Sequence, residues 1–177
     1  MRWVACALWL SLATAASALT IAPYPYVQTS QYGRFYFKMV GSLLTVYKLE
    51  NDGTATELWQ TQMDYAYPGE LLLPEGGEHL IRFLAWVHEQ GPSKDDRVLI
   101  FYKHGSIVKT YASADLVTRH RQFIDSSDGF MLGRGKPEIL GNYPVFPRIR
   151  IGIQDGGEYV FNYDTGEIVA AVKDSLP

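Results

Sequence analysis

Alternating apolar and polar residues recur in short segments along most of this chain. In the segment from Arg34 to Val40, apolar residues from Phe35 onward occupy every second position. The segment from Arg148 to Ile153 repeats this alternation, with isoleucine at every second position. Successive side chains of a β-strand point to opposite faces of its sheet, so this period of two predicts strands that bury one face.

The predicted strands fall into a unit that occurs three times. Each unit has a leading strand, a second strand, a tight turn and a third strand. The turns contain Gly53, Gly105 and Gly166, and glycine tolerates the positive φ that such turns require. An uninterrupted apolar run in the second unit predicts a strand that is covered on both faces. The strands are expected at residues 34–40, 43–49 and 54–61, at 79–87, 97–103 and 106–111, and at 148–153, 158–163 and 167–172.

One short helix is expected in the long insertion between the second and third units. Ser113 can cap its N-terminus, Asp115 complements the positive end of the helix dipole, and Arg119 and Arg121 complement the other end. Glycine and proline punctuate the following stretch, residues 130–147, which we expect to be a loop that crosses the sheet. The apolar stripe of the predicted helix consists of Leu116, Val117, His120, Phe123 and Ile124.

The segment from Glu158 to Glu167 resembles the strand–turn–strand core of a β-propeller blade. Residues 31–35 and 75–79 lie where such repeats place the turn that leads into a blade. The chain is also similar to small exported bacterial proteins, a resemblance that implies no activity. A complete propeller has four to eight blades of four strands, whereas three partial units are found here. We therefore expect an all-β, antiparallel fold of three hairpin-rich, blade-like units, built as a sandwich or a partial propeller with one short helix.

The N-terminus has the pattern of a secretory signal peptide. Arg2 supplies a positive charge, an apolar run extends from Trp3 to Leu12, and Ala16 and Ala18 form a small-x-small ending. We expect cleavage after residue 18, which leaves residues 19–177 as a single β-rich domain that is periplasmic or extracellular. The alternative is that residues 3–22 stay in place as a membrane anchor. No later apolar run is long enough to span a membrane.

Composition narrows the possible chemistry. Cys6 is the only cysteine and lies in the predicted leader, so the mature chain would lack disulfides, thiolate metal sites and a cysteine nucleophile. The absence of disulfides and of glycosylation sequons favours bacterial export. A formal net charge of −3 argues against a nucleic-acid partner, because phosphate binding needs a concentrated basic face.

Motifs for metals and cofactors fail on inspection. His88-Glu89 begins like a zinc-protease motif, but Pro92 stands where the second histidine would be. The segment 129–136 has the wrong spacing for a phosphate-binding loop, and 125–129 lacks the acidic pattern of a calcium loop. We therefore expect no cofactor and no metal, and no catalytic residues can be assigned.

Aromatic residues near strand ends are the strongest indication of function. Exposed aromatic rings on a rigid sheet can anchor a protein partner or stack on a sugar. The sequence favours a non-catalytic binding domain of the cell envelope, with a protein partner preferred over a glycan. An envelope hydrolase that uses loop carboxylates and an architectural component of an envelope assembly are the alternatives. The candidate rim of the binding surface consists of Tyr65, Tyr67, Trp86 and His88.

Each function predicts a different structural feature. A binding domain predicts an exposed aromatic patch with no strongly shifted titrating group nearby. An enzyme predicts a cleft where two carboxylates, or a carboxylate and a histidine, converge. An architectural component predicts an open, hydrophobic sheet edge that needs a partner strand.

Overall fold

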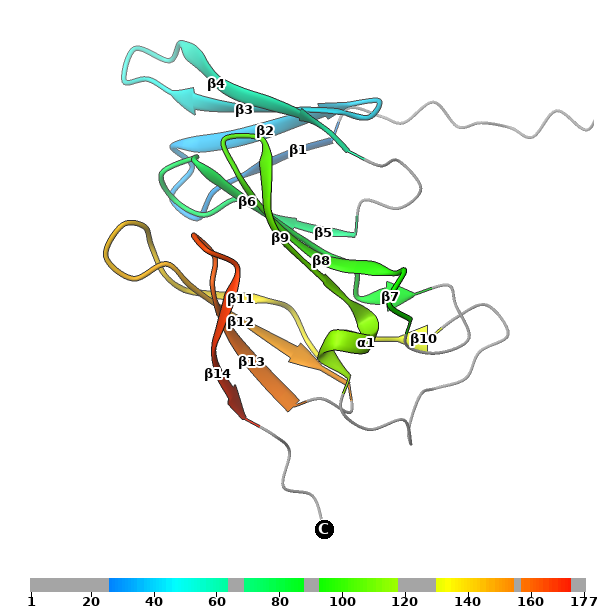
Figure 1. Ribbon diagram of the computed structural model, residues 1–177. Helices are drawn as coiled ribbons and strands as arrows, with labels where there is room; N and C mark the ends of the chain where they lie inside the picture. The colour runs from blue at the N-terminus through cyan, green and yellow to red at the C-terminus, as the bar shows by residue number, and fades with distance from the viewer. Residues whose placement is uncertain (1–25, 64–68, 88–92, 118–129, 155–156, 173–177) are drawn as a thin grey trace, which may run out of the picture.

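Three four-stranded antiparallel sheets make up most of the structure and lie one on another in chain order (Figure 1). The computed structural model describes residues 26–63, 69–87, 93–117, 130–154 and 157–172. The sheets are called here the N-terminal, middle and C-terminal sheets. This architecture confirms the predicted all-β class with three blade-like units and one short helix.

Neighbouring strands within a sheet follow one another along the chain, except where a short detour interrupts the middle sheet. The N-terminal sheet contains β1 (Tyr26–Thr29), β2 (Phe35–Val40), β3 (Leu43–Leu49) and β4 (Ala55–Gln62). The middle sheet contains β5 (Glu70–Leu72), β6 (His79–Phe83), β8 (Arg97–Lys103) and β9 (Ser106–Ala112). The C-terminal sheet contains β11 (Glu138–Gly141), β12 (Arg148–Ile153), β13 (Gly157–Asn162) and β14 (Glu167–Val172).

Two layers of apolar side chains hold the stack together, one on each face of the middle sheet. The layer toward the N-terminal sheet joins Phe37 and Val46 to Leu80 and Ile100. The layer toward the C-terminal sheet contains 14 buried residues, among them Phe101. All five residues of β6 are buried, and so is the apolar run of β8, because the middle sheet is covered on both faces. This confirms the prediction that the strand at residues 97–103 is covered on both faces.

The outer face of the C-terminal sheet carries a cluster of charged side chains on β11, β12 and β13. Nη1 of Arg150 lies 3.2 Å from Oε2 of Glu138, and its Nε lies 3.9 Å from Oε2 of Glu158. All three side chains are exposed, with relative accessibilities between 44% and 62%. Charged groups that are paired and hydrated are costly to bury, so this face suits contact with water.

Each sheet has one more strand than the sequence indicated. The additional strands β1, β5 and β11 come first in their sheets and are only three or four residues long. Each pairs with the leading strand of its unit, so the units are complete four-stranded meanders. The sequence therefore revealed only three of the four strands in each unit, but it predicted the three blade-like units correctly.

The predicted strand at residues 79–87 was also wrong, because it divides into two. β6 ends at Phe83, and β7 (Trp86–Val87) leaves the sheet to pair with β10 (Phe130–Met131). Consequently residues 130–147 are not a simple loop, since they contain both β10 and β11. The backbone of Leu84 still bonds to Val98, so the chain turns away only after this residue.

The predicted helix is present as one turn, α1 (Ser113–Leu116). Ser113 does not cap it: the N-cap residue is Ala112, whose N–H donates to Oδ2 of Asp115 at 2.9 Å. Instead, Oγ of Ser113 lies 3.1 Å from the carbonyl oxygen of Ser93 and 2.9 Å from Oδ2 of Asp96, which ties α1 to the loop before β8. The rest of the expected helix, including Arg119, Arg121, His120, Phe123 and Ile124, lies outside the described residues.

Candidate functional site

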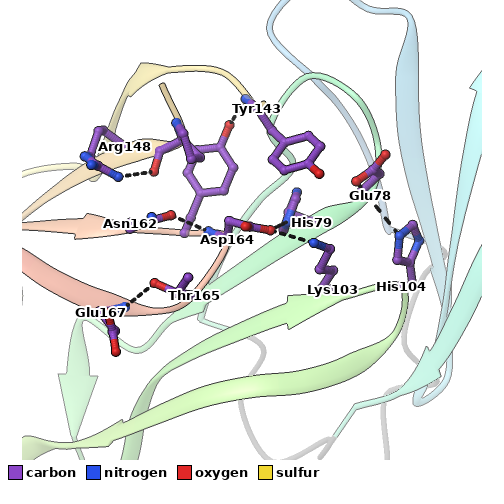
Figure 2. Close-up of polar contacts among 12 residues, drawn as sticks. Glu78, His79, Lys103, His104, Tyr143, Arg148, Asn162, Asp164, Thr165 and Glu167 are labelled. Atoms are coloured by element: carbon purple, nitrogen blue, oxygen red, sulfur yellow. Dashed lines mark hydrogen bonds and ion pairs between the residues drawn. The ribbon is translucent and has the colours of Figure 1, made fainter. Parts of the chain in front are cut away.

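Polar side chains gather where one end of the middle sheet meets the C-terminal sheet (Figure 2). His79 begins β6 and Lys103 ends β8, so the antiparallel ladder places them opposite each other. Asp164 lies in the turn between β13 and β14 and reaches across to both. We call these three residues the polar seam.

The two basic side chains of the polar seam converge on a single carboxylate oxygen. Oδ1 of Asp164 lies 2.9 Å from Nε2 of His79 and accepts a hydrogen bond from Nζ of Lys103 at 2.7 Å. Because a carboxylate only accepts, the neutral His79 ring carries its proton on Nε2. The seam therefore joins two sheets through one acidic turn residue.

Aromatic rings enclose the histidine. The His79 ring centroid lies 5.0 Å from that of Tyr143 and 5.3 Å from that of Tyr163. The Tyr163 hydroxyl accepts a hydrogen bond from the backbone N–H of Tyr143 at 2.7 Å, which holds the two tyrosines in place. Nζ of Lys103 lies 5.2 Å from the centre of the Tyr143 ring, within range of a cation–π contact.

Burial and pairing shift the titration of these groups in different directions. Burial lowers the pKa of His79 below 6.5, although the bond to Asp164 opposes this effect. The hydrogen bond from Lys103 lowers the pKa of Asp164, and the same bond raises the pKa of Lys103. Burial raises the pKa of Tyr163 to about 12. At neutral pH the seam thus contains a neutral histidine beside an ionised Lys–Asp pair.

These groups satisfy one another, which favours a structural role for the polar seam. The histidine and carboxylate converge as the enzyme hypothesis required. However, the His79 side chain is only 1% exposed and is covered by Tyr143 and Tyr163. A general base must come within hydrogen-bond reach of its substrate, and this ring lies beneath aromatic side chains.

A second carboxylate, Glu75, is buried and links the N-terminal and middle sheets. Oε1 of Glu75 accepts a hydrogen bond from the backbone N–H of Tyr32 at 2.7 Å, and the Glu75 side chain is only 6% exposed. Its Oε2 is buried without a hydrogen bond from the described residues, and Nε of Arg34 lies 3.9 Å away. Glu75 joins the two turns that lead into β2 and β6, so it also serves the packing of adjacent sheets.

The free edge of the C-terminal sheet has a different character. Every residue of β14 is exposed, and five consecutive residues, from Ile168 to Val172, are apolar. Its partner on one side is β13, and in the described part of the chain no strand pairs with its other side (Figure 1). The outward backbone groups of such a strand form a template for another chain.

Comparison with the equivalent strands distinguishes β14. In each sheet the last strand has one extra, bulged residue, namely Leu58 in β4, Val108 in β9 and Val169 in β14. These residues have similar exposures of 39%, 38% and 46%. However, β4 carries Glu57 and β9 carries Lys109, whereas β14 has no charge after its first residue. Charges on edge strands oppose unwanted pairing, so among the last strands of the three sheets β14 is the one that lacks this protection.

Three of the four residues that the sequence predicts as a binding rim, Tyr65, Tyr67 and His88, lie outside the described residues. Trp86 belongs to β7, where it pairs with Met131, and the placement of its side chain is not described. Their role as a rim stays a prediction.

The sequence pattern predicted neither the polar seam nor the free edge of β14. Asp164 reads as an ordinary turn residue, and its contact with His79 spans 85 positions, which no local pattern reveals. The sequence does contain a partial signal for the free edge of β14, because this is the last strand of its unit and has five consecutive apolar residues without a charge. Such a run is more often buried, so its exposure had to come from the structure.

In the part of the chain that the structure describes, no three potential metal-ligating side chains form a group, and no helix could span a membrane. No family model and no curated protein matches the sequence. Among solved structures, the chain is similar to the periplasmic gluconolactonase PpgL of Pseudomonas aeruginosa, with a TM-score of 0.39 and 14% sequence identity. The similarity covers 84% of this chain and 39% of that one, so the chain spans about two fifths of the length of the protein it resembles.

Proposed function

We propose that this chain is an exported, non-catalytic interaction module that binds a protein partner through the free edge β14. The observation that carries the proposal is the exposure of all six residues of this strand, five of them apolar. An open hydrophobic edge is the feature expected of the architectural alternative, and an interaction module that binds by strand addition needs the same feature. The binding mode would be strand addition, in which backbone hydrogen bonds supply much of the affinity.

The chemistry of β14 favours a protein over a glycan. An extended peptide offers N–H and C=O groups at the spacing of an open strand, together with apolar side chains for Ile168 and Val169. Sugar binding relies on aromatic faces and polar side chains, and β14 has no aromatic residue and a polar side chain only at Glu167. A protein partner is therefore the better match to this edge.

Export depends on the sequence pattern at the N-terminus. The leader proposed for residues 1–18 would place the mature chain outside the cytoplasm, in the periplasm of a bacterium. An N-terminal sequence of the purified protein that begins at Leu19 would support this part of the proposal. A mature chain that begins at residue 1 would contradict it.

Site-specific photocrosslinking tests the docking edge. A photoreactive amino acid replaces Val169 in the intact chain, and illumination takes place in the cells that produce it. The control places the same group at Val108, which is the equivalent bulged residue of β9 with a similar exposure.

The proposal predicts a discrete protein adduct from position 169 and a much weaker one from position 108. Equal yields at the two positions, or no adduct from position 169, would refute the role of β14. The mass of the adduct identifies the kind of partner.

A further inference from the structure

We infer that the strand that pairs with β14 is β14 of a second copy of this chain. This inference rests on the proposed function, because it names the partner of the same edge. The two strands would run antiparallel about a twofold axis perpendicular to the sheet, so that two C-terminal sheets become one eight-stranded sheet. A twofold axis makes one surface complementary to itself, which is the commonest route to a dimer.

The two faces of β14 determine the register. Ile168 and Ala171 lie opposite Phe161 and Tyr159 of β13, on the face that covers the core. Glu167 lies opposite Asn162, which places it on the other face, together with Ala170 and Val172.

A self-pairing register must match like faces, because a shift of one residue places side chains on opposite sides of the sheet. With Val169 opposite Ala170 of the second copy, Ile168 meets Ala171 on the core-side face. In the same register Glu167 meets Val172 on the other face. The bulge at Val169 is what allows both matches at once.

The side chains in this register are complementary in size. Ile168 stands opposite the small Ala171 and Val169 opposite the small Ala170, and the twofold axis repeats each pair. Cross-strand pairs of this kind are the unit of sheet stabilisation, and alternation of large and small residues lets side chains interdigitate. Each copy would cover apolar surface that the other leaves exposed.

The strands β14 and β9 differ in the charges that self-pairing would bring together. In the same register, with the bulged residue opposite its successor, Lys109 of β9 would stand opposite Val108 of the second copy. The two Lys109 side chains would then lie in adjacent pairs beside the twofold axis, and like charges at such short range destabilise a strand pair. In β14 the single acid, Glu167, stands at the end of the strand and faces valine rather than another acid. Of these two edges, β14 is therefore the one compatible with itself.

Sedimentation of two variants with opposite charges at the edge tests the inference. The first variant carries Val169→Lys and Ala170→Lys, and the second carries Val169→Glu and Ala170→Glu. Both sites are exposed at the edge, so the circular dichroism spectrum of each variant should match that of the wild type. We predict that the wild type sediments with the mass of two chains. We also predict that each variant alone dissociates with a Kd raised at least about a hundredfold, because like charges meet across the axis.

An equimolar mixture of the two variants should recover the mass of two chains as a heterodimer, because lysine then meets glutamate. The matched control, Val108→Lys in β9, should leave the wild-type mass unchanged. A monomeric wild type at all concentrations, or a mixture that stays monomeric, would overturn the inference. If Val169 still yields an adduct with a different protein, the proposed function stands and only self-pairing fails. If no adduct forms at Val169, both fail.

Discussion

Nε2 of His79 and Oδ1 of Asp164 lie 2.9 Å apart, although 85 positions separate them in the sequence. This contact crosses from the middle sheet to the C-terminal sheet. It brings a nearly inaccessible imidazole to a carboxylate that also holds Lys103. The polar seam thus combines with the apolar layer beneath it to fix the relative position of two sheets.

The first prediction concerns the dependence of stability on pH. Burial lowers the pKa of His79 below 6.5, so in acid the unfolded chain binds a proton that the folded chain excludes. The contribution of this group is complete above pH 6.5 and is lost as the pH falls through the folded pKa. The free energy of unfolding should decline by up to about 1.4 kcal/mol per pH unit from this group alone.

Urea unfolding between about pH 7.5 and about pH 5.5 measures this decline. His79→Gln keeps an amide that can donate to Asp164 and removes the titration, so its profile should be flatter than that of the wild type. His104→Gln, at a histidine that is 60% exposed, should retain the wild-type slope. Parallel profiles for the wild type and His79→Gln would contradict the assignment.

Glu75 provides a second prediction. Truncation by Glu75→Ala leaves the N–H of Tyr32 without its acceptor and should cost about 1–3 kcal/mol. Glu75→Gln retains an acceptor oxygen and removes a buried charge, so it should stay within about 1 kcal/mol of the wild type. The control Glu138→Ala removes a carboxylate that is 62% exposed and should cost no more than about 0.5 kcal/mol. Chemical denaturation that finds equal, small effects for Glu75→Ala and Glu138→Ala would disprove the structural role of Glu75.

A third prediction concerns the turn that leads into β14. Gly166 has a φ of +74°, and an added Cβ would overlap the side chain of Lys109. Gly53 has a φ of +83° in the equivalent turn of the first unit, but open space surrounds it. Gly53→Ala should cost about 1–2 kcal/mol because of its backbone conformation. Gly166→Ala should cost about 1–3 kcal/mol more, because its Cβ also overlaps Lys109. Equal losses in thermal unfolding would show that the contact with Lys109 is absent.

The sequence revealed the longer strands because alternation needs several residues to be visible. The strands β2, β3, β8, β12 and β14 match their expected ranges within one residue. The first strands of the sheets were missed because β5, for example, has only three residues and shows no period. The end of β6 was missed because the apolar pattern continues past Phe83 while the backbone turns away.

The polar seam and the exposure of β14 were harder to predict, because both depend on contacts between distant parts of the chain. The polar seam depends on how sheets stack, and stacking places Asp164 beside His79 without any local pattern. The run in β14 was correctly read as a strand, but whether a neighbour covers it depends on the whole fold. Local periodicity therefore identifies the strands, whereas the exposure and long-range contacts that define candidate sites require the fold.

Hydrogen exchange tests the pairing of β14 most directly. Peptides that cover Glu167–Val172 are compared by mass spectrometry in solutions that differ about a hundredfold in protein concentration. A hundredfold range is enough to change dimer occupancy by mass action. The account predicts that exchange in this strand slows at the high concentration, while exchange in Ser106–Ala112 of β9 does not change. Exchange in β14 that is fast and identical at both concentrations would contradict it.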